Sequence, residues 1–216
     1  GLAEGQLEHP PPLRQTLTGH QGKVYALVAT TPGYFASGGA DKTLRLWQWG
    51  HPRSIATLTG HRLPVQALAF DSSRSLLASG SSDATVKIWN LETQSSIASL
   101  NHHTAAIKAV AFSPQGEVLA SAGNDRTILL WDTHSWTLNA TLPGHGWPIT
   151  ALGFAATGNE LFSSSWDKTI QQWQLQPPQA TATLSGHLDA IHCFALSTDR
   201  RLISGSADGT LKIWTV

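Results

Sequence analysis

Residues 103–132 read HTAAIKAVAFSPQGEVLASAGNDRTILLWD, and units of this form recur along the chain. The tryptophans that close the units recur at intervals of 42, 42, 42 and 41 residues, at Trp47, Trp89, Trp131, Trp173 and Trp214. The histidines that open them recur at intervals of 41, 42, 42 and 42, at His20, His61, His103, His145 and His187. A period of about 40 to 45 residues is typical of four-stranded propeller blades. The spacing therefore predicts five copies of one structural unit.

Within the quoted unit, short apolar runs alternate with turn residues. Ser113 to Gly116 form a turn with proline in its second place, and residues 123–126 form a tight corner. Four strands are expected, at residues 107–112, 117–122, 127–132 and 136–142. No segment of the chain shows a sustained apolar period of about 3.6 residues. The unit is therefore predicted to be a four-stranded antiparallel meander, and the chain to be all-β.

Composition narrows the classes of partner. The formal net charge is zero and only 13% of the 216 residues are charged, so no basic field attracts nucleic acid or an anionic membrane. No apolar run approaches the roughly 18 residues that a membrane-spanning helix needs. Cys193 is the only cysteine, which favours a reducing, cytoplasmic location. Methionine is absent, also at position 1, and for this reason we expect the chain to be a module of a larger protein.

The recurring order Gly-His, Ser, Asp-x-Thr and Trp resembles the WD40 repeat family over residues 13–216. The resemblance implies a β-propeller domain of five four-stranded blades. It also implies that one histidine, serine, aspartate and tryptophan per repeat form a hydrogen-bonded tetrad. The five expected tetrads are His20, Ser37, Asp41 and Trp47; His61, Ser79, Asp83 and Trp89; His103, Ser121, Asp125 and Trp131; His145, Ser163, Asp167 and Trp173; and His187, Ser204, Asp208 and Trp214.

The two ends of the chain look complementary. Residues 13–18 read as a lone fourth strand, and residues 211–216 read as a third strand. We expect the first segment to complete the last blade and close the ring, which leaves no open sheet edge. The alternative is a five-repeat segment of a larger ring. Residues 1–12, with prolines at 10 to 12, are interpreted as an extended leader or linker.

Serine, histidine and aspartate in one cluster suggest a hydrolase triad. Five identical clusters indicate a building unit instead, because an activated nucleophile needs a single serine with its own oxyanion hole. The remaining histidines show no metal-ligand spacing: His9, His51, His102, His134 and His192. No metal, no cofactor and no catalytic residue is predicted. Cys193 stands where other repeats have alanine, and is interpreted as a small buried packing residue.

The resemblance implies that partners dock on the face that carries the aspartate corner, which we call the top face. The expected binding residues are Trp166, Tyr25, Lys23, Trp147, Gln66, Lys108, Asn124, Thr150 and His192. Trp166 is the strongest candidate, since other repeats have Ala, Ser or Asn there. In the alternative interpretation Trp147 and Trp166 pack against each other. The function hypothesis is protein or peptide binding; the alternatives are glycan binding and, last, hydrolysis.

Overall fold

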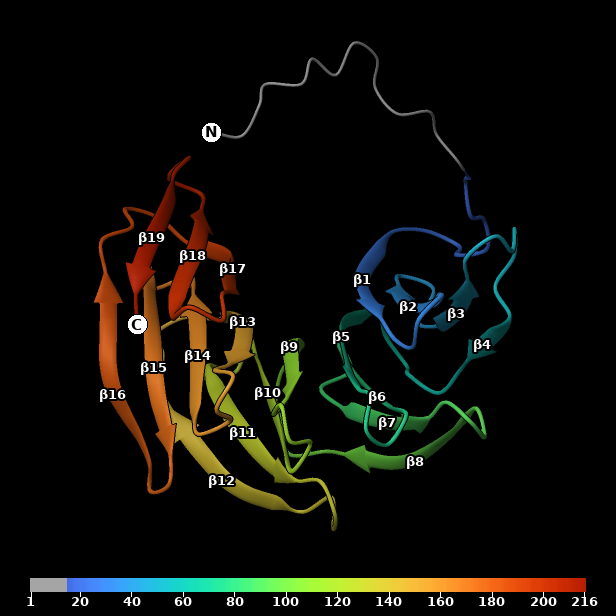
Figure 1. The fold of residues 1–216 in the computed structure, drawn as a ribbon, viewed down its shortest axis with the longest axis horizontal. Helices are drawn as coiled ribbons and strands as arrows, with labels where there is room; N and C mark the ends of the chain where they lie inside the picture. The colour runs from blue at the N-terminus through green and yellow to red at the C-terminus, as the bar shows by residue number, and fades with distance from the viewer. Residues whose placement is uncertain (1–14) are drawn as a thin grey trace.

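The computed structural model describes residues 15–216, and in this part of the chain every regular element is a β-strand. The strands form five antiparallel sheets, one for each repeat. Figure 1 shows the sheets side by side along an arc, in the order of the sequence. This confirms the predicted all-β fold of five repeats. We number the sheets as blades 1 to 5.

Each blade is an antiparallel meander. Blade 1 contains β1 (Val24–Ala29), β2 (Tyr34–Gly39), β3 (Leu44–Gln48) and β4 (Ala56–Leu58). Blade 2 contains β5 (Val65–Asp71), β6 (Leu76–Ser81), β7 (Val86–Asn90) and β8 (Ser95–Leu100). Blade 3 contains β9 (Ile107–Phe112), β10 (Val118–Gly123), β11 (Thr127–Asp132) and β12 (Leu138–Pro143). Blade 4 contains β13 (Ile149–Phe154), β14 (Glu160–Ser165), β15 (Thr169–Leu175) and β16 (Pro178–Ser185). Blade 5 contains β17 (Ile191–Leu196), β18 (Arg201–Ser206) and β19 (Leu211–Thr215).

The apolar core lies between neighbouring blades. In blades 2 to 5 the first strand begins with a β-branched residue that is 0% exposed, namely Val65, Ile107, Ile149 or Ile191. Val65 packs in one cluster with Leu44 and Leu46 of the preceding blade. Burying such a side chain contributes about 1.5 to 3 kcal/mol. The leading residue of each repeat therefore attaches its blade to the one before it.

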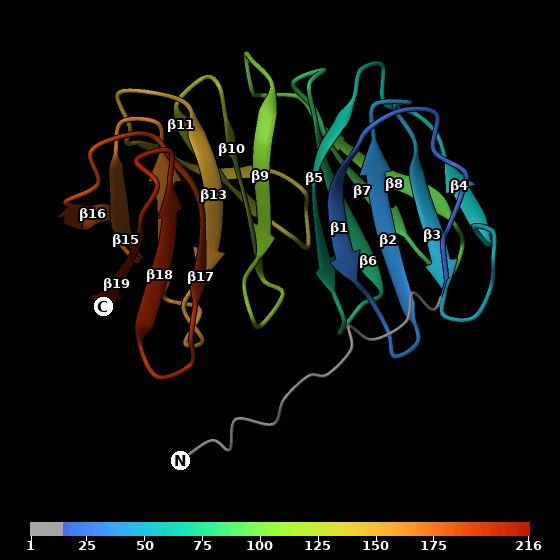
Figure 2. The same ribbon diagram turned by 90° about the horizontal axis from the view of Figure 1, so that it is seen from above.

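Blade 5 has three strands, and β19 pairs only with β18 among the described residues. Residues 15–20 contain no strand, so the closing strand expected at 13–18 is not formed by residues 15–18. Residues 13 and 14, like the leader at 1–12, lie outside the described residues. Figures 1 and 2 place blades 1 and 5 at opposite ends of the arc. Closure of the ring is not shown, and a five-repeat segment of a larger ring is compatible with this arrangement.

The prediction for Cys193 is wrong, because its side chain is exposed. The equivalent alanines of blades 2 and 3, Ala67 and Ala109, are 8% and 7% exposed. Ala67 packs in a cluster with Ile107 and Val110 of the following blade. No blade follows blade 5 within the described residues, so Cys193 has nothing to cover it. The position is buried by its neighbour, which the residue type alone does not reveal.

Candidate binding face

The top face carries the tight corner of each blade, where the tetrad aspartate lies. Blade 2 illustrates how this corner is held. The Nε1–H of Trp89 donates to Oγ of Ser79 at 2.8 Å, and Nε2 of His61 lies 2.7 Å from the same Oγ. The ionised carboxylate of Asp83 beside Nδ1 only accepts, so in the neutral ring Nε2 of His61 is the acceptor and takes the hydroxyl proton of Ser79. The other ring nitrogen, Nδ1, then carries the proton and donates to Oδ2 of Asp83 at 3.0 Å. Burial lowers the pKa of His61, in keeping with a neutral ring.

The structure joins the corresponding residues of the other four blades by the same three contacts. They link His20, Ser37, Asp41 and Trp47; His103, Ser121, Asp125 and Trp131; His145, Ser163, Asp167 and Trp173; and His187, Ser204, Asp208 and Trp214. The five serines are at most 3% exposed. A substrate has no access to these hydroxyls, and each one already accepts a hydrogen bond from tryptophan. The tetrads are therefore built to hold strands together.

Each tetrad aspartate also accepts bonds from its own corner. Burial would raise the pKa of Asp83, but the hydroxyl of Thr85, the amide of Arg62 and the His61 ring donate to it, and its pKa falls to about 2. The pKa values of Asp41 and Asp167 also fall to about 2, because hydrogen-bond donors outweigh the effect of burial. The carboxylates are therefore charged at neutral pH and fix the corner at each blade.

A β-bulge places one residue of each first strand on the top face. In blades 1, 2, 4 and 5 the register shifts directly after the leading residue, and in blade 3 at the same place between Ala122 and Gly123 of the partner strand. The residues skipped by the pairing are Tyr25, Gln66, Lys108, Thr150 and His192. Bulges re-aim side chains. The family resemblance predicted binding residues at these positions, and the bulge explains why their side chains differ in direction from those of the paired residues.

Trp147 and Trp166 are the most prominent aromatic side chains of this face. They are 61% and 46% exposed and line a hollow of about 400 Å³ together with Asp167, Lys168 and Asp189. Their backbones are fixed nonetheless, since Ser165 Oγ donates to the carbonyl of Trp147 at 3.0 Å and the amide of Trp166 donates to the carbonyl of Pro148 at 3.1 Å. Among the described residues, the aromatic ring pairs do not include Trp147 with Trp166. Both indoles are therefore open to a partner.

The other expected binding residues are distributed around the arc. Tyr25, in blade 1, is 45% exposed and does not line the tryptophan hollow of blade 4. Lys108 Nζ donates to Oε1 of Gln66 at 3.2 Å and so links blades 2 and 3. Thr150 Oγ1 donates to the carbonyl of Ile191 at 2.7 Å, across the junction of blades 4 and 5. Exposed side chains complete the face: Lys23, Asn124 and His192.

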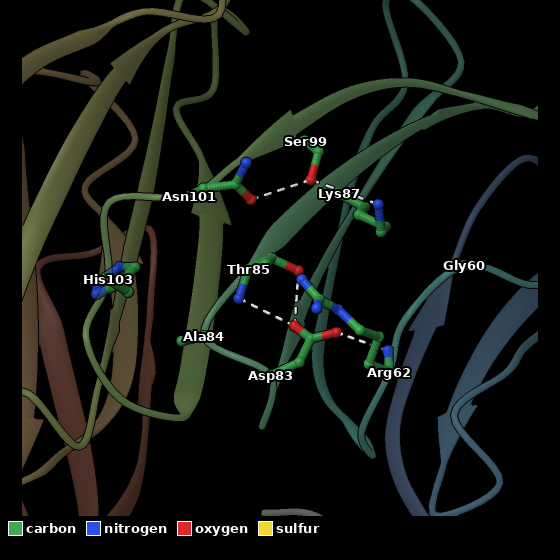
Figure 3. A pocket seen from close by; sticks show the side chains of 9 residues that line it. All are labelled: Gly60, Arg62, Asp83, Ala84, Thr85, Lys87, Ser99, Asn101 and His103. Carbon is green, nitrogen blue, oxygen red and sulfur yellow. Dashed lines mark hydrogen bonds between the residues drawn. The ribbon is translucent and has the colours of Figure 1, made fainter.

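A second hollow, of about 310 Å³, lies on blade 2 beside the Asp83 corner, and Figure 3 shows its lining. It brings together Arg62 and Lys87 with the polar side chains of Ser99 and Asn101. Sequence reasoning missed it because these residues come from separate strands and loops. Lys87 does not stand out in the sequence either, since the equivalent residues of the other repeats are Arg, Leu, Gln and Lys. The hollow is polar and partly cationic.

Two kinds of feature are absent from residues 15–216: a membrane-spanning helix and a group of metal ligands. No helix in residues 15–216 is long and apolar enough to cross a membrane. Within the same range, no group of three or more His, Cys, Asp or Glu side chains is arranged to hold a metal ion.

Comparison with known families agrees with the fold. The family model for the WD40 repeat, described as WD domain, G-beta repeat, matches residues 12–48, 52–90, 94–132, 136–174 and 178–215. The chain therefore belongs to the WD40 family. No curated protein matched the chain. Repeats of this family generally serve as protein-interaction scaffolds, and the family is generally non-catalytic.

Proposed function

We propose that this chain is a non-catalytic WD40 scaffold that binds a protein or peptide through its top face. The observation that carries the proposal is the pair Trp147 and Trp166, two exposed indoles on backbones held by hydrogen bonds at the rim of one hollow. Tryptophan is enriched among the residues that dominate binding energy. Little ordering entropy is lost on binding when the backbone of an anchor is already fixed.

The hollow suits a peptide side chain that is apolar or cationic. Asp189 lines it, and the faces of the two indoles attract cations as well as apolar groups. Lys168 lines the same hollow and supplies a single positive charge beside the two aspartates. A peptide with an aromatic, aliphatic or basic anchor residue is therefore the expected ligand.

A displayed peptide library selected against the 216-residue protein supplies the probe for a direct test. The strongest selected peptide is then titrated by calorimetry into wild-type protein and into the double variant Trp147→Ala with Trp166→Ala. The double variant should bind at least about 30-fold more weakly. The matched control is Trp49→Ala, because Trp49 is 72% exposed but lies at the end of β3, outside the hollow. Equal affinity in the double variant would contradict the proposed site.

Glycan binding is the second candidate, and the same exposed indoles favour it, because flat aromatic faces stack on sugar rings. A glycan array separates the two proposals. Array binding that disappears in the double variant, together with failure to select any peptide, would replace the peptide ligand by a glycan at the same hollow.

A further inference from the structure

The two ends of the arc expose apolar faces that are buried everywhere else in the molecule. On blade 5, Leu211 is 75% exposed and Ile213 is 69% exposed. The residues equivalent to Leu211 in blades 1 to 4 are all 0% exposed: Leu44, Val86, Ile128 and Ile170. Those equivalent to Ile213 in blades 1 to 3 are at most 7% exposed: Leu46, Ile88 and Leu130. Blade 5 therefore presents a face that is built to be covered.

The four internal junctions show what covers such a face. At each one, the β-branched residue that begins the next blade lies on it, as Val65 does on Leu44 and Leu46. The approach is close: a Cβ added at Gly38 would lie 2.5 Å from Cγ1 of Val65, and one at Gly80 would lie 2.6 Å from Cγ2 of Ile107. Blade 5 has glycine at the equivalent place, Gly205, where the described residues provide no following blade. A Cβ built at Gly205 would meet only side chains of blade 5 itself, Cys193 Sγ at 3.2 Å and Leu211 Cδ2 at 3.5 Å.

Blade 1 carries the matching surface. Its leading residue, Val24, is 53% exposed, whereas the leading residues of blades 2 to 5 are 0% exposed. Leu27, on the same strand, is 69% exposed. The face of blade 1 and the face of blade 5 are thus the two halves of one more junction of the same kind.

The chain also holds the strand that blade 5 lacks. Residues 16–20 read TLTGH, identical to residues 57–61 at the end of β4. In β4 the leucine of this motif, Leu58, is 4% exposed and pairs with Leu44 of β3. Leu17 is the corresponding leucine, and Leu211 of β19 corresponds to Leu44. Residues 15–18 form no strand in the described structure, and β19 has a free edge to receive them.

We infer that these faces join two copies of the chain head to tail, with Val24 of one copy seated on Leu211, Ile213 and Gly205 of the other. Residues 15–18 of the first copy add to β19 as the fourth strand of blade 5. A second copy carries both faces and the missing strand, whereas the two faces of one copy lie at opposite ends of the arc (Figures 1 and 2). Such an interface is heterologous, so each copy keeps one face free for a further copy.

The first test blocks each face separately and measures molar mass by light scattering over a range of protein concentrations. Wild-type protein should exceed the mass of one chain and grow with concentration. Val24→Glu alone, and Leu211→Glu with Ile213→Glu alone, should each give a single chain. A mixture of the two should give a one-to-one dimer that grows no further, because each partner has one intact face. The matched control is Ile97→Glu, since Ile97 is 48% exposed on β8, away from both faces; it should associate as wild type does.

The second test uses a disulfide to identify the occupant. Val24→Cys and Gly205→Cys are combined in a Cys193→Ser background and oxidised. Dimers and longer ladders on a non-reducing gel support contact between copies. A cross-linked single chain would overturn the inference, since the ring would then close on itself. Uncross-linked protein with the mass of one chain at every concentration would also overturn it, and would leave a blade of a different polypeptide as the occupant.

Discussion

The corners of blades 2 and 4 have the same backbone hydrogen bonds but differ in the two residues that flank the tetrad aspartate. The residue before the tetrad aspartate is Ser82 in blade 2 and Trp166 in blade 4. Its amide donates to a proline carbonyl in both blades, at 2.9 Å from Ser82 to Pro64 and at 3.1 Å from Trp166 to Pro148. The next residue, Asp83 or Asp167, is locked into its tetrad. Adjacent residues therefore differ in role: the aspartate holds the fold, and the residue before it is the one through which we propose that blade 4 binds a partner.

The first way to break this comparison is to remove the holding residue. Asp83→Ala leaves the buried ring of His61 and the amide of Arg62 without their acceptor. Leaving a buried neutral donor without its charged acceptor costs about 1 to 3 kcal/mol. We expect the free energy of unfolding, measured by urea denaturation, to fall by that amount. A loss below about 1 kcal/mol would show that the tetrad does not hold the blade.

Acid should weaken all the corners together. The pKa values of Asp41, Asp83 and Asp167 are lowered from 3.8 to about 2 in the folded protein. A group whose pKa is depressed by folding stabilises the protein above its unfolded pKa, and this contribution is lost as pH falls through the folded value. Because these carboxylates are only partly buried, the stabilisation from each should fall by about 1 to 2 kcal/mol between about pH 4 and pH 2.

The pKa of His61 is lowered too, by burial, so a smaller loss of stability in the same direction begins as pH falls below about 6.5. Urea denaturation at a series of pH values measures both effects. Asp83→Asn should flatten the acidic part of the curve, because one of the titrating carboxylates is gone. A free energy of unfolding that is constant from pH 7 to 2.5 would contradict the hydrogen-bonding scheme.

A smaller effect is expected inside the same corner. Thr85→Val removes the hydroxyl that donates to Oδ1 of Asp83 at 2.6 Å, while the Thr85 amide continues to donate to that oxygen. The free energy of unfolding should fall by about 1 to 2 kcal/mol. Thr57→Val is the matched control, since Thr57 is exposed on β4, and it should change stability by less than about 0.5 kcal/mol. Equal losses in the two variants would assign the effect to strand packing rather than to the corner.

The smallest effect on stability should come from the variable residue. Trp166→Ser gives blade 4 the side chain that blade 2 has, and the amide bond to Pro148 does not depend on the side chain. Because the indole is 46% exposed, the free energy of unfolding should change by no more than about 0.5 kcal/mol. A thermal or urea denaturation curve measures it. A loss of 2 kcal/mol or more would mean that Trp166 belongs to the scaffold.

The sequence was sufficient for the parts of the fold that each repeat specifies locally. The spacing of Trp47 and its counterparts, with apolar runs between turn residues, predicted five all-β units, and the structure has five. Exposure at the ends depends on what lies beyond a blade. Val24 and Cys193 have the residue types of buried positions but are exposed, because the contacts that bury their counterparts come from a neighbouring blade. Local patterns carry no information on that neighbour.

The candidate site divides in the same way. The bulge that exposes Tyr25 and its counterparts recurs in every blade, so a repeat pattern locates those positions. The directions of the Trp147 and Trp166 side chains follow no repeat, and the sequence left open whether the two rings pack together. The hollow of Arg62 and Lys87 was missed because it forms only when separate strands and loops meet.

The indole N–H signals of the nine tryptophans test the central claim most directly, in proton–nitrogen correlation spectra recorded while the selected peptide is added. The account predicts that the signals of Trp147 and Trp166 shift in proportion to bound peptide. The five tetrad indoles, which donate to buried serines, should stay in place. Shifts confined to the tetrad indoles, or saturation with Trp147 and Trp166 unmoved, would contradict the division between residues that hold the blades and residues that bind.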